Sequence, residues 1–223
     1  MIYTIYGRPK TGKTTFALSG RENHKKTLII NADQGLVGVN TEGATIVNDV
    51  SINNLNQIID DPNLSKKYDR VVIDTVTQLY DEFLIEASGG KTPSLNTRGA
   101  VNNVFANLLR SLRSSGIKEI ICLAQEKIIL PSEDWSPDDD EEDAVASVTI
   151  HLPAGASNTL CVMSDVIGRL YIAHVNEKNV RRLWVSPTPG IVAGARSQHY
   201  REKPPYLVKP TISRLNKLLG WTD

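Results

Sequence analysis

Residues 7–14 combine two glycines, a lysine and a threonine at a spacing that suits a chain of phosphates. They read Gly-Arg-Pro-Lys-Thr-Gly-Lys-Thr, which satisfies the pattern G-x-x-x-x-G-K-[ST] in full. Glycine lets the backbone turn tightly and direct N–H groups at phosphate oxygens, and the N-terminus of a following helix adds partial positive charge. In this pattern Lys13 reaches the β- and γ-phosphates, and the Thr14 hydroxyl binds Mg²⁺. We therefore expect ATP with Mg²⁺ to contact Gly7, Arg8, Pro9, Lys10, Thr11, Gly12, Lys13, Thr14 and Thr15.

The sequence on either side of this motif is the context that a phosphate-binding loop requires. Residues 1–6 (MIYTIY) predict a short apolar strand, and residues 14–19 (TTFALS) predict the start of a helix. The alternative is that the motif matches by chance. From the usual frequency of glycine, such a match is expected in about one chain in a hundred of this length.

Two aspartates follow apolar runs that are typical of buried strands. Asp74 ends the run RVVID, where a carboxylate can hold Mg²⁺ through the Thr14 hydroxyl or through a water molecule. The alternative for Asp74 is that it caps the following helix. Asp33 follows the run TLIIN, and a carboxylate at such a strand end can orient and deprotonate a water molecule. The alternative for Asp33 is a turn aspartate that precedes Gly35.

Gln125 ends a third apolar run, IKEIICLA, over residues 117–124. A neutral amide at that position can form a hydrogen bond with the γ-phosphate or the attacking water and transmit its presence to the next loop. The alternative is a solvated glutamine at the end of a strand.

Apolar runs of this kind alternate with helical patterns along the first half of the chain. We expect strands at residues 1–6, 27–31, 44–47, 70–74 and 117–124, and helices at residues 14–19, 51–59 with Ser51 as its cap, 76–87 and 98–115 with Gly116 as its stop. The alternation predicts an α/β fold with a mostly parallel central sheet and helices on both faces.

The pattern changes after this point, although we expect residues 1–223 to form a single domain. Residues 126–157 have weak periodicity and predict a mobile acidic loop or insert. Residues 166–174 and 180–185 flank a turn at 176–179 and predict a C-terminal β-hairpin. Residues 186–210 contain prolines and glycines typical of an irregular segment. Within the C-terminal extension 186–223, residues 211–219 predict a short amphipathic helix.

Positive and negative charges are segregated along the chain, although its formal net charge is zero. Residues 133–143 contain eight Asp and Glu and no Lys or Arg, so the remainder has 25 Lys and Arg against 17 Asp and Glu, or +8. From residue 151 onward there are ten Lys and Arg against four Asp and Glu. A neutral isoelectric point therefore does not exclude an anionic partner.

Targeting and redox signals favour a cytoplasmic protein. There is no apolar run of about 18 residues that would span a membrane, and the N-terminus lacks the pattern of a signal peptide. The two cysteines, Cys122 and Cys161, do not have the spacing of a metal site, which favours a reduced intracellular chain.

Taken together, these residues resemble the core of RecA-type recombinases, and in particular the short, phage-encoded RecA-like ATPases that anneal single-stranded DNA. The resemblance spans about residues 1–200. In RecA proteins the strand after the phosphate loop ends in I-D-A-E, and its glutamate is the catalytic base. The matching residues 30–33 read INAD, which implies that Asp33 is the base, with a side chain one methylene shorter. The aspartate strand matches residues 71–74 (VVID), and the switch glutamine matches Gln125.

The resemblance also implies partners and DNA-binding segments. The family has two mobile DNA-binding loops, which match residues 88–98, with Lys91 and Arg98, and residues 126–150. The second contains Lys127 followed by the eight acids, which departs from the family pattern, and no segment matches the N-terminal polymerisation arm of bacterial RecA. ATP is expected at the subunit interface of a homo-oligomer, completed by a cation from the neighbour. Our candidates for that cation are Arg196 and, behind it, Arg201 or Lys203.

Cations and aromatic residues in the second half of the chain are candidate contacts for single-stranded DNA, because phosphates attract Lys and Arg while unstacked bases favour aromatic rings. These candidates are Arg169, Arg181, Arg182, Tyr171, Trp184, Tyr200 and Arg201. The hairpin pattern equally allows Tyr171 and Trp184 to lie in the core. The acidic residues 133–143 are interpreted as a mimic of nucleic acid, as a docking segment for a basic protein, or as a solvated loop.

The resulting prediction is an ATPase that binds single-stranded DNA as an oligomer in recombination, annealing or repair, and the resemblance implies phage DNA in the host cytoplasm. One alternative is a nucleotide-gated interaction module without significant turnover. Another is a small-molecule kinase acting on a nucleoside or nucleotide, in which Asp33 deprotonates an acceptor hydroxyl. Such kinases close an arginine-bearing lid over the phosphates, whereas the long segment available here is acidic.

Overall fold

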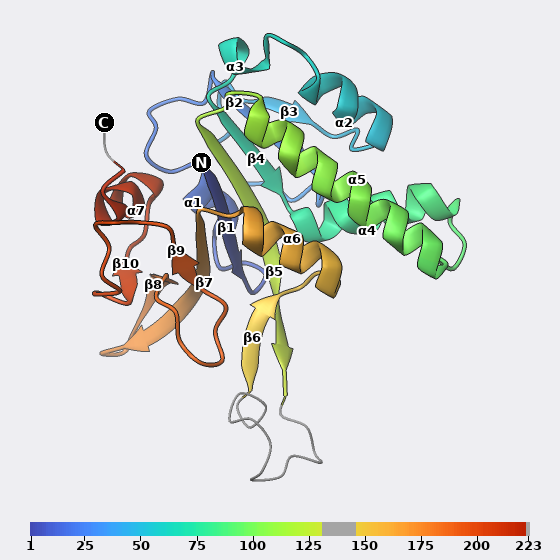
Figure 1. Cartoon of the computed structure of the whole chain (residues 1–223). Helices are drawn as coiled ribbons and strands as arrows, with labels where there is room; N and C mark the ends of the chain where they lie inside the picture. Colours follow the sequence, from blue (N-terminus) through green and yellow to red (C-terminus); the bar gives the residue numbers. More distant parts are fainter. Residues whose placement is uncertain (131–145, 222–223) are drawn as a thin grey trace.

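A computed structural model describes residues 1–130 and 146–221, in which one central sheet is covered by helices on both faces (Figure 1). In chain order the elements are β1 (Ile2–Gly7), α1 (Lys13–Ala17), β2 (Thr27–Asn31), β3 (Thr45–Val47), α2 (Ile52–Ile59), α3 (Leu64–Lys67), β4 (Arg70–Asp74), α4 (Val76–Ser88), α5 (Leu95–Ser114), β5 (Glu119–Ile129), β6 (Ser147–Ile150), α6 (Ala154–Met163), β7 (Val166–Val175), β8 (Lys178–Trp184), β9 (Gly194–Ala195), β10 (Tyr206–Val208) and α7 (Ile212–Leu219). None of the helices in these two stretches has the length and apolar content needed to cross a membrane.

The order of the strands brings Gly7, Asp74 and Gln125 to one edge of the sheet. The strands run β10-β8-β7-β1-β5-β4-β2-β3, with β6 added to β5 and β9 added to β7. From β7 to β3 every neighbouring pair along this path is parallel, whereas β8, β9 and β10 pair in the antiparallel direction. Because parallel strands end at the same edge, Gly7 lies beside Gln125 and Asn31 lies beside Asp74. The predicted α/β fold class is confirmed.

Two apolar clusters hold the sheet between its helices. Along β1, Ile2 and Tyr6 belong to the cluster that also contains the buried faces of α2, α4, α5 and α6. Tyr3 and Ile5 belong to the other cluster, which contains residues of α1 and α7. The successive residues of a strand point to opposite faces, and a strand buried on both faces is therefore apolar throughout. This is why β1, β2 and β4 appeared in the sequence as continuous apolar runs.

The prediction of a loop over residues 126–157 is wrong for the part that the structure describes. β5 does not end at Ala124 but continues to Ile129 and pairs with β6, and the first turn of α6 begins at Ala154, before the predicted end of the loop. α6 has the sequence AGASNTLCVM and buries only Ala156 and Leu160. Its small and polar residues produce little hydrophobic periodicity, so its helical character was not visible in the sequence. The acidic residues 133–143 lie outside the described residues.

The C-terminal segments are also more regular than predicted. Residues 186–210, expected to be irregular, contribute β9 and β10 to the sheet. The hairpin is confirmed, but its turn is shorter, with Asn176 and Glu177 at φ 47° and 62°. Two central residues with positive φ form the type of turn whose twist matches that of the flanking strands.

α5 begins three residues before the predicted position, so part of the expected DNA-binding loop at 88–98 is helical. The Ser94 hydroxyl accepts a hydrogen bond from the Thr97 backbone N–H at 3.1 Å, which satisfies one of the free N–H groups at the helix end. Of the two cations predicted in this loop, Arg98 therefore lies on the first turn of α5, and Lys91 lies before the helix.

We predict that Ser94→Ala lowers the free energy of unfolding of the first turn of α5 by about 1 kcal/mol, because its cap is lost. Amide hydrogen exchange at Thr97 and Arg98 is expected to accelerate by about fivefold. Ser114→Ala is a matched control at the other end of α5, since the Ser114 hydroxyl donates to the Ser111 carbonyl and accepts no helix N–H. Equal exchange in the Ser94 variant and the wild type would contradict the cap.

Candidate active site

The phosphate loop joins β1 to α1, and both of its glycines are required by their surroundings. A Cβ at Gly7 would lie 2.2 Å from the Leu170 carbonyl oxygen on β7. Gly12 has φ +87°, and a Cβ there would lie 2.6 Å from a guanidinium nitrogen of Arg181. At Gly7 a larger residue is therefore excluded by backbone that is distant in the sequence, whereas at Gly12 it is disfavoured mainly by the positive φ.

Lys13 is held inside the loop by three acceptors. Its ammonium group donates to the carbonyl oxygens of Gly7 and Arg8, each at 3.0 Å, and to the Gln125 side-chain oxygen at 3.2 Å. The side chain is buried, and this burial lowers the pKa of Lys13, while the nearby carboxylates of Asp74 and Asp33 act in the opposite direction. A desolvated cation surrounded by neutral acceptors is well placed for an arriving phosphate.

Thr14 and Asp74 form the donor set that a magnesium ion requires. The Thr14 hydroxyl donates to the Asp74 carboxylate at 2.6 Å, although the residues are 60 positions apart. A hydroxyl and a carboxylate beside bound phosphates are typical ligands of Mg²⁺, so these residues fit the ion. When bound, the ion would neutralise charge that develops on the phosphates. The alternative of Asp74 as a helix cap is not what the structure shows, because the Thr75 hydroxyl accepts from Gln78 N instead.

The Asp74 carboxyl group is difficult to ionise in the nucleotide-free protein. Burial raises the pKa of Asp74 to about 6, and the negative charge of Asp33 acts in the same direction. The Thr14 hydrogen bond and the Lys13 ammonium lower it, but by less. A cation bound at this position would favour the ionised form.

Gln125 and Asp33 lie at the same edge of the sheet but differ in how they are held. The Gln125 backbone N–H donates to the Thr77 hydroxyl at 3.1 Å, and its side chain contacts Lys13, so it is not a freely solvated glutamine. The backbone N–H of Asp33 donates to the Asp74 carbonyl oxygen. Its exposed carboxylate accepts from Gly35 N at 2.9 Å, which is the turn role given above as the alternative. This role leaves the other carboxylate oxygen available.

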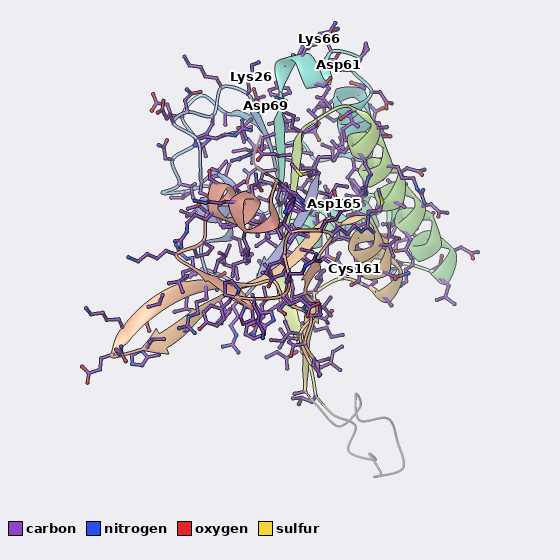
Figure 2. All side chains as sticks on the ribbon, turned by 60° about the vertical axis from the view of Figure 1, so that its left-hand side comes forward. Lys26, Asp61, Lys66, Asp69, Cys161 and Asp165 are labelled. Carbon is purple, nitrogen blue, oxygen red and sulfur yellow. The ribbon has the colours of Figure 1, made fainter. Side chains whose placement is uncertain are left out.

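Arg196 lies at the opposite edge of the sheet. Its guanidinium group donates to the Val162 carbonyl and lies 3.7 Å from the carboxylate of Asp165, which is labelled in Figure 2. Asp165 also accepts from Ile2 N, at the amino end of β1, whereas the phosphate loop follows the carboxyl end. Arg196 therefore does not meet the phosphate loop of its own chain, and its contact with a neighbour's ATP stays a prediction.

Two charged residues at the site were not assigned to it from the sequence. Glu126 is almost fully buried and accepts from Nε of Arg8 at 2.9 Å and Nε of Arg169 at 3.0 Å. Arg181 donates through Nε to the Thr11 carbonyl at 2.7 Å. The position of Glu126 directly after Gln125 was the only signal in the sequence. The ion pairs depend on β1, β5 and β7 being neighbours, which no local pattern reveals.

For two of the residues predicted to contact DNA, Arg181 and Tyr200, the structure shows contacts within the protein. Arg181 packs against the phosphate loop, as described above. Tyr200 is buried, and its hydroxyl donates to the Pro204 carbonyl at 2.9 Å, so it belongs to the core of the C-terminal segment.

Comparison with known proteins extends these observations. A family model described as "AAA domain" matches residues 1–197. No match was found among the curated proteins. Among solved structures, the chain is similar to a KaiC-like protein from the hyperthermophilic archaeon Pyrococcus horikoshii. The two share 12% identity with a TM-score of 0.45, over 82% of this chain and 76% of the other.

Proposed function

The chain belongs to the AAA domain family of P-loop nucleotide-binding ATPase domains, and from this premise we propose that it hydrolyses ATP and couples turnover to single-stranded DNA. The observation that carries the first part is the position of Lys13 between the phosphate-loop carbonyls and Gln125. We further propose an oligomer with ATP at the subunit interface and, from the resemblance to RecA-like proteins, a role in recombination, annealing or repair of phage DNA.

The proposed reaction needs one base and several groups that stabilise charge. A water molecule attacks the γ-phosphorus, its proton passes to the Asp33 carboxylate, and the bond to the β–γ bridging oxygen breaks to release ADP and phosphate. Lys13 and the backbone N–H groups of the loop stabilise the charge on the phosphate oxygens. Gln125 orients the water or the γ-phosphate through its side-chain amide.

The coupling to DNA is supported by the continuity of β5 beyond the nucleotide. Gln125 is followed directly by Glu126, which joins the phosphate-loop residue Arg8 to Arg169 on β7. β5 then continues with β6 as a two-stranded arm that projects from the body of the molecule (Figure 1). A change at the γ-phosphate therefore has a short covalent path to the residues 126–150 that match the family's second DNA-binding loop.

The decisive experiment is a measurement of ATP hydrolysis with and without single-stranded DNA at two salt concentrations. We expect DNA to stimulate turnover, and we expect the stimulation to weaken at high salt because phosphate contacts release counterions. No effect of DNA together with no salt-dependent DNA binding in the ATP state would overturn the proposal. ATP binding without turnover would favour the nucleotide-gated module, and phosphorylation of a nucleoside would favour a kinase.

We predict that Asp33→Asn lowers kcat for ATP by about 10²-fold with little change in ATP affinity, because the variant loses the base but keeps the acceptor for Gly35. Single-turnover hydrolysis and binding of a fluorescent ATP analogue measure the two quantities separately. Asp49→Asn is the matched control, since Asp49 makes the same type of turn, with Ser51 N. Turnover of Asp33→Asn at the wild-type rate would show that Asp33 is not the base and has only the structural role in the turn.

A further inference from the structure

One face of the β7–β8–β10 strip presents a group of arginines and aromatic rings, which we name the arginine–aromatic face. Cross-strand pairing places Arg169 opposite Trp184, Trp184 opposite Tyr206, and Tyr171 opposite Arg182. Paired residues of neighbouring strands point to the same side of a sheet. The five members of this face are Arg169, Tyr171, Arg182, Trp184 and Tyr206.

The members of this face are stacked on one another. The Arg182 guanidinium lies 4.3 Å from the centroid of the Tyr206 ring, and that ring stacks with Trp184 at 6.0 Å and 30°. Arg169 lies 5.6 Å from the centroid of Tyr171. All five side chains are half-buried. The face is therefore preordered by its own stacking contacts.

On the other side of β7, β8 and β10, the side chains belong to the hydrophobic core. Leu170, Leu183 and Leu207 pack in the cluster that also contains the buried residues of α7. The helices α4, α5 and α6 cover the opposite side of the central sheet, but their layer ends before the β7–β8 hairpin, which projects from the body in Figure 1 and in Figure 2. The arginine–aromatic face is thus a partly exposed sheet surface, because all five of its side chains keep part of their area accessible to solvent.

The chemistry of this surface fits a single strand of nucleic acid. Bases stack on aromatic rings whatever their identity, and arginines bind phosphates and also stack. By strand alternation Lys178 adds a further cation on the same side. Within residues 1–130 and 146–221, the acid that pairs with this face is Glu126, and it is neutralised by Arg8 and Arg169. A protein partner would explain the aromatic rings but not the excess of cations.

We propose that single-stranded DNA binds across the arginine–aromatic face, with its bases against Trp184 and Tyr206 and its phosphates near Arg182. This proposal rests on the proposed function and adds the surface on which the DNA lies. Through Glu126, Arg169 is connected to Arg8 in the phosphate loop, and Glu126 directly follows Gln125. The DNA-binding face and the nucleotide site therefore share one buried carboxylate, which provides the physical link between them.

Equilibrium binding of a labelled oligo-dT in the presence of Mg²⁺ and a non-hydrolysable ATP analogue tests this proposal, with fluorescence anisotropy as the readout. We expect Trp184→Ala to weaken binding by about tenfold, and Trp184→Phe to recover most of it, because stacking needs a ring rather than an indole. Arg182→Gln is expected to lower the salt dependence by about one phosphate contact. Tyr68→Ala and Lys66→Ala are controls near α3, at the far end of the molecule, where Figure 2 labels Lys66.

A second measurement does not depend on the folding of any variant. Ultraviolet crosslinking of the wild-type protein to oligo-dT is expected to modify peptides that contain residues 178–184 or 206–208. If the wild type binds DNA but the variants bind equally well and the crosslinks lie elsewhere, DNA does not bind on the arginine–aromatic face. The proposed function is then unaffected. If the wild type does not bind single-stranded DNA at either low or high salt, both proposals fail.

Discussion

Lys13→Ala is expected to lower kcat/KM for ATP by about 10³-fold, because the variant loses the ammonium group that this motif directs at the β- and γ-phosphates. The Lys13 ammonium is held in the loop by the carbonyls of Gly7 and Arg8 and by Gln125. A charged group is most effective in an active site when its surroundings hold it in place.

Steady-state release of phosphate measures this loss, and binding of a fluorescent ATP analogue shows how much of it is loss of affinity. Lys26→Ala is a suitable control, since the Lys26 side chain is exposed in a loop before β2. Thermal unfolding of both variants establishes that they fold. Retention of turnover within tenfold of the wild type would contradict the assignment of Lys13 to the phosphates.

Asp74→Asn is expected to have opposite effects on activity and on stability. The amide still accepts a hydrogen bond from Thr14 but has no charge for Mg²⁺, so magnesium-dependent turnover should fall by about 10³-fold. In the nucleotide-free protein, however, the same substitution should raise the melting temperature at pH 7.5. The reason is that the wild-type carboxylate is ionised in a buried position, where burial raises the pKa of Asp74 to about 6.

The sign of the pH dependence follows from this shift. Because the folded-state pKa of Asp74 lies above that of the unfolded chain, the folded protein binds more protons between pH 4 and 6, and its stability falls as the pH rises through that range. The gain in melting temperature in Asp74→Asn should therefore disappear toward pH 4. The kcat/KM of the wild type, which reports the free enzyme, should decline below about pH 6, where Asp74 takes up a proton, whereas kcat at saturating Mg²⁺ and ATP should decline at a lower pH. A pH-independent difference in melting temperature would contradict this explanation.

The parts of the fold that were predictable are those whose signal is local. β2 and β4 have the predicted bounds because they are buried on both faces, which makes their central residues 28–30 and 71–73 apolar. α6 was not predicted because it buries only Ala156 and Leu160, which is too few apolar residues to produce a helical pattern in the sequence. The extension of β5 to Ile129 was missed because its stability depends on pairing with β6, which lies beyond the acidic segment.

The same distinction applies to the site. Asp33, Asp74 and Gln125 were recognised as strand ends, but the sequence left each with a structural alternative. Asp74 is not the cap of the following helix, because Thr75 caps α4. Gln125 is not a freely solvated glutamine, because its side chain contacts Lys13. For Asp33 the turn role and the proximity to Asp74 are both present.

The sequence by itself determined the phosphate-binding loop, because the motif that cradles phosphates consists of eight adjacent residues, 7–14, and can be recognised without any long-range contact. Only the tertiary structure decided what surrounds the loop. The strand order places Glu126 between Arg8 and Arg169, and it gathers the arginine–aromatic face from three strands. The physical reason is that ion pairs and stacked rings act over a few ångströms in space, and strands that are distant in the sequence become neighbours only after the sheet has formed.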